Sequence, residues 1–173
     1  MAGVFIGLLE WILSKLPAWL SRWYWTEEKL SRNVKFDLRP RTSPIEIWFS
    51  DGGKLEIILK IENRNSIPIV IDRILGSFTF ESKVGPINLQ FLERVRLPAG
   101  AEKDHIELFA ELSSYNRKRL WGAFKDTSWR ARGFLKYRLE IDTKFRSFTK
   151  ADTLESISHF DPINIPDSVE DIN

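Results

Sequence analysis

The stretch LEIILKIENRNSIPIVIDRILGSFTF, residues 55–80, decides the fold. In residues 54–62 apolar and polar side chains alternate, which is the period of a β-strand with one buried face. Asn63-Arg64-Asn65-Ser66 follows as a polar turn, since Asn side chains hydrogen-bond nearby backbone groups and tolerate left-handed backbone angles. Residues 67–82 contain two further strand candidates, which we expect to be separated by a break near Gly76.

The same two-residue period continues on both sides of this stretch. Residues 114–125 interrupt the alternation and predict a helix that Ser113 or Ser114 can cap. Several short strands separated by Gly and Pro turns are typical of an antiparallel sandwich. The body therefore predicts a mainly β, antiparallel immunoglobulin/fibronectin-like β-sandwich with one crossing helix. The additional strand candidates are residues 33–38, 45–49, 87–97, 104–112 and 129–142.

The central stretch resembles the late embryogenesis abundant group 2 family, also called the water-stress and hypersensitive-response (WHy) domain. The shared pattern is an alternating strand that ends in an Asn-x-Asn turn (Asn63, Asn65), followed by an apolar strand with Pro68 and a bend at Gly76. The sequence LPAG at 97–100 resembles a later turn of that family. The resemblance implies a non-enzymatic fibronectin-like or immunoglobulin-like sandwich. Relatives are associated with stress tolerance, many follow an N-terminal membrane segment, and some are proposed to hold lipid between their sheets.

Residues 1–25, MAGVFIGLLEWILSKLPAWLSRWYW, form an N-terminal segment unlike the rest of the chain and contain four of its seven tryptophans. Read as a helix, the segment has a very wide apolar face and a narrow stripe of small and polar residues. We expect an amphipathic or membrane helix with a bend at Pro17. The stripe consists of Gly3, Gly7, Glu10, Ser14, Ala18 and Ser21.

Three environments suit such a segment. As a transmembrane helix, residues 4–25 would be about 33 Å long, but Glu10, Lys15 and Arg22 would each cost about 2.5–3.5 kcal/mol near the middle of a span. As an interfacial helix, it would lie in the membrane plane with its tryptophans at the headgroup boundary. As a partner-buried helix, it would pack through its small residues against another protein or a second copy. We favour the interfacial arrangement.

The membrane- or partner-contacting residues predicted from this pattern are apolar and the headgroup-contacting residues are basic. The first group is Phe5, Ile6, Leu9, Trp11, Ile12, Leu16, Trp19, Leu20 and Trp23, and the second is Lys15, Arg22, Lys29 and Arg32. Positive charge that flanks a membrane segment favours the cytoplasmic side. We therefore expect a membrane-associated protein with a cytoplasmic body.

Composition excludes several classes of site. The absence of cysteine excludes disulfides and thiolate metal sites, and His105 and His159 are too few for a histidine metal cage. We expect no cofactor, no metal and no catalytic residue, and we interpret Asp104-His105 as a polar strand start. The basic clusters at 117–119 and 130–138 lack a recognition motif, which argues against nucleic acid as a partner.

The net charge of +2 hides an asymmetry, because residues 151–173 contain six Asp and Glu and no Lys or Arg. The sequence thus divides into an anchor (1–25), a WHy-like body (26–150) and an acidic C-terminal tail (151–173). We expect a non-enzymatic, membrane-associated β-sandwich module that acts as a binding or scaffolding protein. The alternatives are a lipid-binding or transfer protein that holds an acyl chain, and an accessory subunit of a larger membrane complex.

Overall fold

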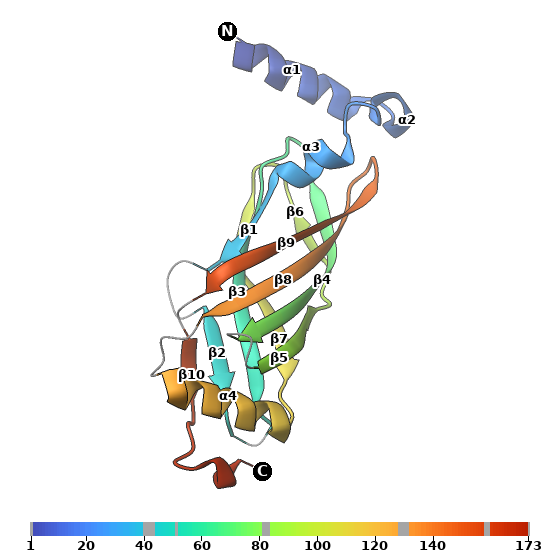
Figure 1. Ribbon diagram of the computed structural model, residues 1–173. Coiled ribbons are helices and arrows are strands. Elements are labelled where there is room, and N and C mark those ends of the chain that lie inside the picture. The colour runs from blue at the N-terminus through green and yellow to red at the C-terminus, as the bar shows by residue number, and fades with distance from the viewer. Residues whose placement is uncertain are drawn as a thin grey trace.

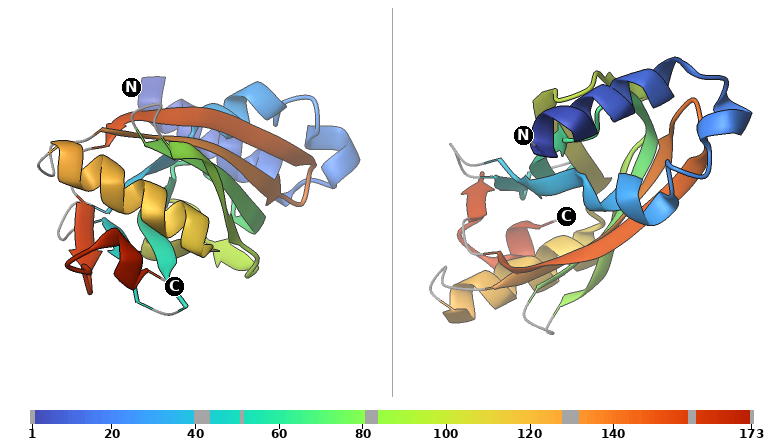
Figure 2. Two further views of the ribbon diagram at one scale, coloured as in Figure 1. Left: turned by 60° about the horizontal axis from the view of Figure 1, so that its bottom comes forward. Right: turned by 90° about the horizontal axis from the view of Figure 1, so that it is seen from above.

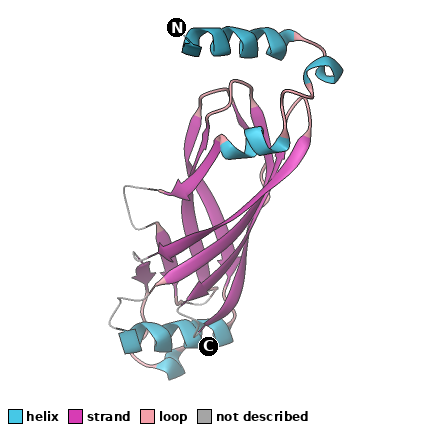
Figure 3. Ribbon diagram, turned by 45° about the horizontal axis from the view of Figure 1, so that its top comes forward, coloured by secondary structure: helices cyan, strands magenta, loops and turns pink. Residues whose placement is uncertain are grey.

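The computed structural model describes residues 2–39, 44–50, 52–80, 84–127, 132–157 and 160–172. Helices gather at its two ends and strands lie between them (Figures 1 and 3). The helices are α1 (Ala2–Lys15), α2 (Ala18–Ser21), α3 (Glu27–Arg32) and α4 (Ser114–Thr127), with a short 3-10 turn η1 (Val169–Asp171). The strands are β1 (Val34–Leu38), β2 (Ile45–Trp48), β3 (Lys54–Asn63), β4 (Ile69–Phe80), β5 (Val84–Phe91), β6 (Val95–Leu97), β7 (Glu102–Glu111), β8 (Gly133–Asp142), β9 (Ser147–Ile157) and β10 (Phe160–Ile163).

The protein is mainly β, as expected, and its described strands form one mixed sheet. The strand order is β10-β2-β3-β7-β5-β4-β8-β9, with β1 beside β3 and β6 beside β4. The β10–β2 pair is parallel and the other pairs are antiparallel. The expected all-antiparallel arrangement is thus wrong at β10, because the chain returns to β2 in the same direction after β9. An immunoglobulin/fibronectin-like sandwich stays a prediction, since the strands are continuous in a single sheet.

The sheet curves strongly enough to enclose its own core (Figure 2). The rings of Phe36 on β1 and Tyr137 on β8 stack with centroids 3.8 Å apart, although β1 and β8 are far apart in the strand order. Several strands are buried at every second residue, for example at Leu55, Ile57 and Leu59 on β3. The predicted alternation is therefore confirmed as the pattern that builds the core.

Two helix starts follow from local capping. The Thr26 side chain accepts a hydrogen bond from the Lys29 amide (3.3 Å) at the start of α3. The Ser113 hydroxyl accepts one from the Asn116 amide (3.2 Å) at the start of α4, as the sequence predicted. Pro17 lies between α1 and α2, where the sequence predicted a bend.

Gly76 does not break a strand, which corrects the expectation of two strands in residues 67–82. Strand β4 runs without interruption from Ile69 to Phe80. A Cβ atom at Gly76 would lie 2.7 Å from Leu108 Cδ2 and 3.1 Å from Leu135 Cδ1. Glycine is therefore needed here for the close approach of two core side chains rather than for a bend.

In the described residues 151–157 and 160–172 the chain continues the sheet and packs on it, and β9 crosses the predicted domain boundary at 150. Residues 151–157 continue β9 along β8, and β10 pairs with β2. The Ile172 side chain is buried, and the Trp121 indole donates to the Pro166 carbonyl oxygen (3.0 Å). The acidic side chains occupy exposed positions between apolar residues that pack on the body, so a charge count alone gave the wrong boundary.

The Asn-x-Asn turn is confirmed and forms a buried polar network. The side-chain nitrogen Nδ2 of Asn63 donates to the carbonyl oxygens of Ile67, Leu97 and Pro98, at distances of 2.9–3.2 Å. Its side-chain oxygen accepts from the backbone and side-chain amides of Asn65 (3.1 and 3.0 Å). The network thus joins the β3–β4 turn to the turn after β6.

We predict that Gly76→Ala lowers the free energy of unfolding by about 1–3 kcal/mol, because the added methyl group overpacks the core against Leu108 and Leu135. The matched control is Gly122→Ala within α4, where nothing lies within 4 Å of the new Cβ atom. That control should be neutral or stabilising by up to about 1 kcal/mol, because alanine is the better helix former. Equal denaturation midpoints for the two variants would contradict the close approach at Gly76.

We predict that Asn63→Ala destabilises the fold by about 3 kcal/mol, since it leaves buried carbonyl groups and the Asn65 amide without their partner. The same substitution at exposed Asn88 should change the stability by less than about 0.5 kcal/mol. Chemical denaturation followed by circular dichroism measures both. A loss at Asn63 no larger than at Asn88 would show that the network does not stabilise the fold.

Candidate functional site

The N-terminal segment exposes its apolar side chains to solvent. Trp11, Trp19 and Trp23 have relative exposures of 61%, 76% and 72%, which is unusual for tryptophan in a folded protein. We call the exposed set the apolar face. It consists of Leu8, Leu9, Trp11, Ile12, Leu16, Trp19, Leu20 and Trp23.

The predicted contact residues fall on this face wherever their side chains are described. Leu9, Trp11, Ile12, Leu16, Trp19, Leu20 and Trp23 are all exposed, whereas the side chains of Phe5 and Ile6 lie outside the described residues. The structure adds Leu8 to the set. Two apolar residues of the N-terminal segment, Leu13 and Trp25, do not belong to the face because they are buried.

Glu10 and Ser21, the two residues of the polar stripe whose side chains are described, contact the protein instead of solvent. Ser21 is fully buried, and the relative solvent exposure of the Glu10 side chain is 18%. Glu10 Oε1 lies 2.9 Å from Lys29 Nζ on α3 and accepts a hydrogen bond from the Tyr24 hydroxyl (3.2 Å). A surface helix ordinarily buries its apolar stripe, so the orientation of α1 is the reverse of the usual one.

Lys29 and the rings around it hold α1 and α3 together. The Lys29 ammonium lies 3.5 Å from the centroid of the Tyr24 ring and 4.9 Å from that of Trp25, within cation–π range. Burial raises the pKa of Glu10, whereas hydrogen bonds from Lys29, Ser66 and Tyr24 and the charge of Lys29 lower that pKa. These contacts outweigh burial, so the pKa of Glu10 lies below its ordinary value.

Further contacts join the segment and α3 to the sheet. The Trp25 ring stacks on Phe145 at the tip of the β8–β9 hairpin (centroids 5.6 Å apart). Arg146 Nη2 donates to the Arg22 carbonyl oxygen (3.0 Å). Lys150 Nζ on β9 donates to the Ser31 carbonyl oxygen (3.1 Å), and burial lowers the pKa of Lys150.

The predicted headgroup-contacting cations divide into two groups. Lys15, Arg22 and Arg32 are exposed, and the Lys15 ammonium lies 6.0 Å from the centroid of the Trp11 ring. Lys29 differs, because its ammonium is engaged by Glu10 and two rings. No sequence pattern indicates that engagement, since Glu10 and Lys29 are 19 residues apart.

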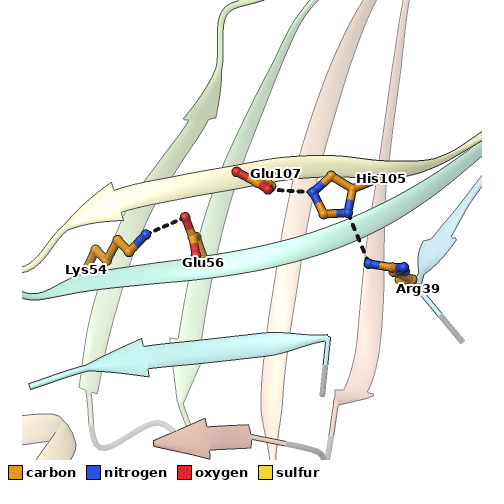
Figure 4. Close-up of polar contacts among 5 residues, drawn as sticks. All are labelled: Arg39, Lys54, Glu56, His105 and Glu107. Atoms are coloured by element: carbon orange, nitrogen blue, oxygen red, sulfur yellow. Dashed lines mark hydrogen bonds and ion pairs between the residues drawn. The ribbon is translucent and has the colours of Figure 1, made fainter. Parts of the chain in front are cut away.

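A second cluster of polar side chains, separate from Glu10 and Lys29, lies on the exposed face of β3 and β7 (Figure 4). His105 Nδ1 lies 3.0 Å from Arg39 Nη1, and His105 Nε2 lies 2.5 Å from Glu107 Oε1. Both ring nitrogens of His105 are therefore engaged by neighbouring side chains, and Asp104 is not among these partners. In the described part of the chain no group of His, Asp and Glu is arranged to hold a metal ion. His159 lies outside the described residues.

Two further features bear on the site. The Arg117 side chain is buried and donates to the carbonyl oxygens of Phe49 and Ser50 (3.0 and 2.9 Å), so it is structural rather than part of a basic surface.

Among the described helices, none combines the length and hydropathy that a membrane span requires.

Comparisons with known proteins give the chain no family. Neither a protein-family profile nor a curated protein matches the sequence. Solved structures resemble the fold only loosely. A protein from Archaeoglobus fulgidus is 12% identical, with 71% of this chain and 91% of that chain covered and a TM-score of 0.45. A protein from Arabidopsis thaliana is 18% identical over 76% of this chain and 82% of that chain, with a TM-score of 0.38.

One structural neighbour bears on the resemblance stated above. It is a candidate late embryogenesis abundant (LEA) protein, 12% identical over 85% of this chain and 84% of that chain, with a TM-score of 0.38. Membership of the WHy family stays a prediction.

We predict that loss of the Glu10 charge loosens α1 from the body. Because the pKa of Glu10 is lowered in the folded state, its ion pair with Lys29 is present at neutral pH and is lost as the pH falls through that lowered value. Glu10→Gln should therefore give several-fold faster amide hydrogen exchange in α1 at neutral pH. Compared at the same pH, the wild type and the variant should show equal exchange in α1 only in acid, where Glu10 of the wild type is protonated.

The matched control is Glu28→Gln, which removes an exposed carboxylate from α3. It should leave exchange in α1 unchanged. Identical exchange in α1 for Glu10→Gln and Glu28→Gln would show that the ion pair does not orient the helix.

Proposed function

We propose that this protein is a non-enzymatic binding or scaffolding module that attaches to a membrane surface through the apolar face of its N-terminal segment. The observation that carries the proposal is the reversed orientation of that segment. Its polar residue Glu10 is held against Lys29 and Tyr24, while Trp11, Trp19 and Trp23 are exposed. An exposed apolar patch of this kind needs an apolar environment to cover it.

A lipid interface suits the composition of the face better than a protein groove. Tryptophan favours the boundary between headgroups and acyl chains, where its ring is in an apolar layer and its N–H group is near water. Lys15 and Arg22 adjoin the tryptophans and would reach lipid phosphates. With α1 only 14 residues long and Pro17 after it, attachment in the membrane plane is the arrangement that we propose.

The body would then lie on the cytoplasmic side. Positive charge next to a membrane segment favours that side, and Arg22 and Arg32 contribute to it. The same apolar face could instead be covered by a subunit of a larger membrane complex or by a second copy of the chain. That alternative predicts association with protein in the absence of lipid.

We predict that the double variant Trp19→Ser/Trp23→Ser weakens binding to phosphatidylcholine vesicles by on the order of tenfold or more, because interfacial binding scales with the apolar area that the helix buries. The measurement is flotation of the full chain on a density gradient. The control is Leu92→Ser/Phe109→Ser, which removes two exposed apolar residues. Leu92, in the loop after β5, has a relative exposure of 60%, and Phe109, on β7, has one of 44%. It should float like the wild type.

Failure of the wild type to float, or equal flotation of both double variants, would contradict membrane attachment. Sedimentation of the lipid-free wild type as a dimer that Trp19→Ser/Trp23→Ser converts to a monomer would favour a second copy instead.

A further inference from the structure

A hollow of about 740 Å³ lies on the outer face of the sheet beside the β8–β9 hairpin tip. Val70 on β4 is the cross-strand partner of both Arg96 on β6 and Asp142 on β8, so these three side chains share one face. Arg94, Lys144 and Arg146 also line the hollow. Its volume is in the range of ligand-binding sites.

The hairpin tip that forms one wall is rigidly built. The backbone amide and the hydroxyl of Thr143 both donate to the Arg146 carbonyl oxygen (3.0 and 2.9 Å). The Thr143 hydroxyl in turn accepts from the amides of Phe145 and Arg146 (both 3.1 Å). The wall is therefore held in one conformation without a ligand, which lowers the entropic cost of binding one.

Cations outnumber carboxylates in this hollow. Four Arg and Lys side chains line it together with one carboxylate, that of Asp142. Arg94 lies 2.9 Å from Asp72 and 3.7 Å from Asp142. With Asp72 counted, four cations face two carboxylates, and this net positive charge suits a phosphate group.

The hollow adjoins the end of the N-terminal segment, at two residues that flank Trp23 of the apolar face in the sequence. Phe145 and Arg146 of its wall are the residues that contact Trp25 and the Arg22 carbonyl oxygen. A lipid with its acyl chains beside Trp23 would thus have cationic residues of the same protein close to its headgroup. Soluble phosphate would meet only the cationic part of this arrangement.

We infer that the hollow binds the phosphate-bearing headgroup of an anionic phospholipid, with Arg96, Lys144 and Arg146 as its cationic contacts. The inference rests on the proposed membrane attachment and adds to it a preference among lipids. The apolar face supplies binding to any bilayer, and the hollow supplies selection for exposed phosphate.

The test compares flotation on phosphatidylcholine vesicles with flotation on vesicles that also contain phosphatidic acid. The variant Arg96→Glu/Lys144→Glu reverses two charges of the hollow. The control Lys118→Glu/Lys125→Glu makes the same change in net charge on exposed residues of α4, at the opposite end of the molecule from α1–α3 (Figures 1 and 3). Thermal unfolding should show that both variants are folded.

The wild type should prefer the phosphatidic acid vesicles, and the hollow variant should lose on the order of tenfold or more of that preference. The α4 control should keep most of it. Equal losses in the two variants would show that only net charge matters, and would overturn the site. The two proposals fail separately, since membrane attachment is read from phosphatidylcholine alone and the hollow from the difference between vesicles.

A titration with inorganic phosphate distinguishes the lipid from a free anion. The amide NMR signals of residues 142–147 should shift only at high phosphate concentration, because a free anion gains nothing from the apolar face. Tight binding of inorganic phosphate, with vesicle preference unchanged by Arg96→Glu/Lys144→Glu, would identify a soluble phosphate site and overturn the lipid assignment.

Discussion

The buried amides of Asn63 and Asn65 connect the sheet to the N-terminal segment, and the position of that segment depends on them. Asn65 Nδ2 donates to Asn63 Oδ1 (3.0 Å) and lies 3.3 Å from the Leu30 carbonyl oxygen of α3. The position of α3 fixes Lys29, and Lys29 holds Glu10 of α1. Each link is buried or partly buried, so water does not compete for it as it would at the surface. One polar turn between two strands thereby helps to position α3, and through Lys29 the face of α1 that meets solvent.

This chain of contacts explains why the protein exposes apolar surface that it could otherwise bury. If α1 turned its apolar face to the body, Glu10 would lose its ion pair with Lys29 and the hydrogen bond from the Tyr24 hydroxyl. Breaking a partly buried ion pair on one side leaves an uncompensated charge. The ion pair therefore favours the outward orientation, and the unfavourable exposure of Trp19 and Trp23 is offset only where another apolar phase covers them.

The strands and turns were predictable because their signals are local. Alternation located the strands from β1 to β8 but not β9 and β10. The Asn-x-Asn turn, the Ser113 cap and the bend at Pro17 depend on residues within four positions of each other. The errors arose where partners are distant in sequence. Gly76 reads as a break until Leu108 and Leu135 are known to pack against it. Similarly, Trp25 is buried and Trp23 is exposed, and the Phe145 ring that stacks on Trp25 is distant in the sequence.

The candidate site shows the same division between local and distant signals. The exposed apolar residues followed from helical periodicity, whereas the basic hollow joins residues from β4, β6 and the β8–β9 hairpin that no spacing connects. Its relation to the apolar face depends on Phe145 and Arg146, which contact the N-terminal segment directly. Because these contacts hold the hairpin tip against the segment, a surface that covers Trp23 also comes close to the hollow. In the arrangement that we propose, the fold would present an apolar contact and a cationic contact at one end.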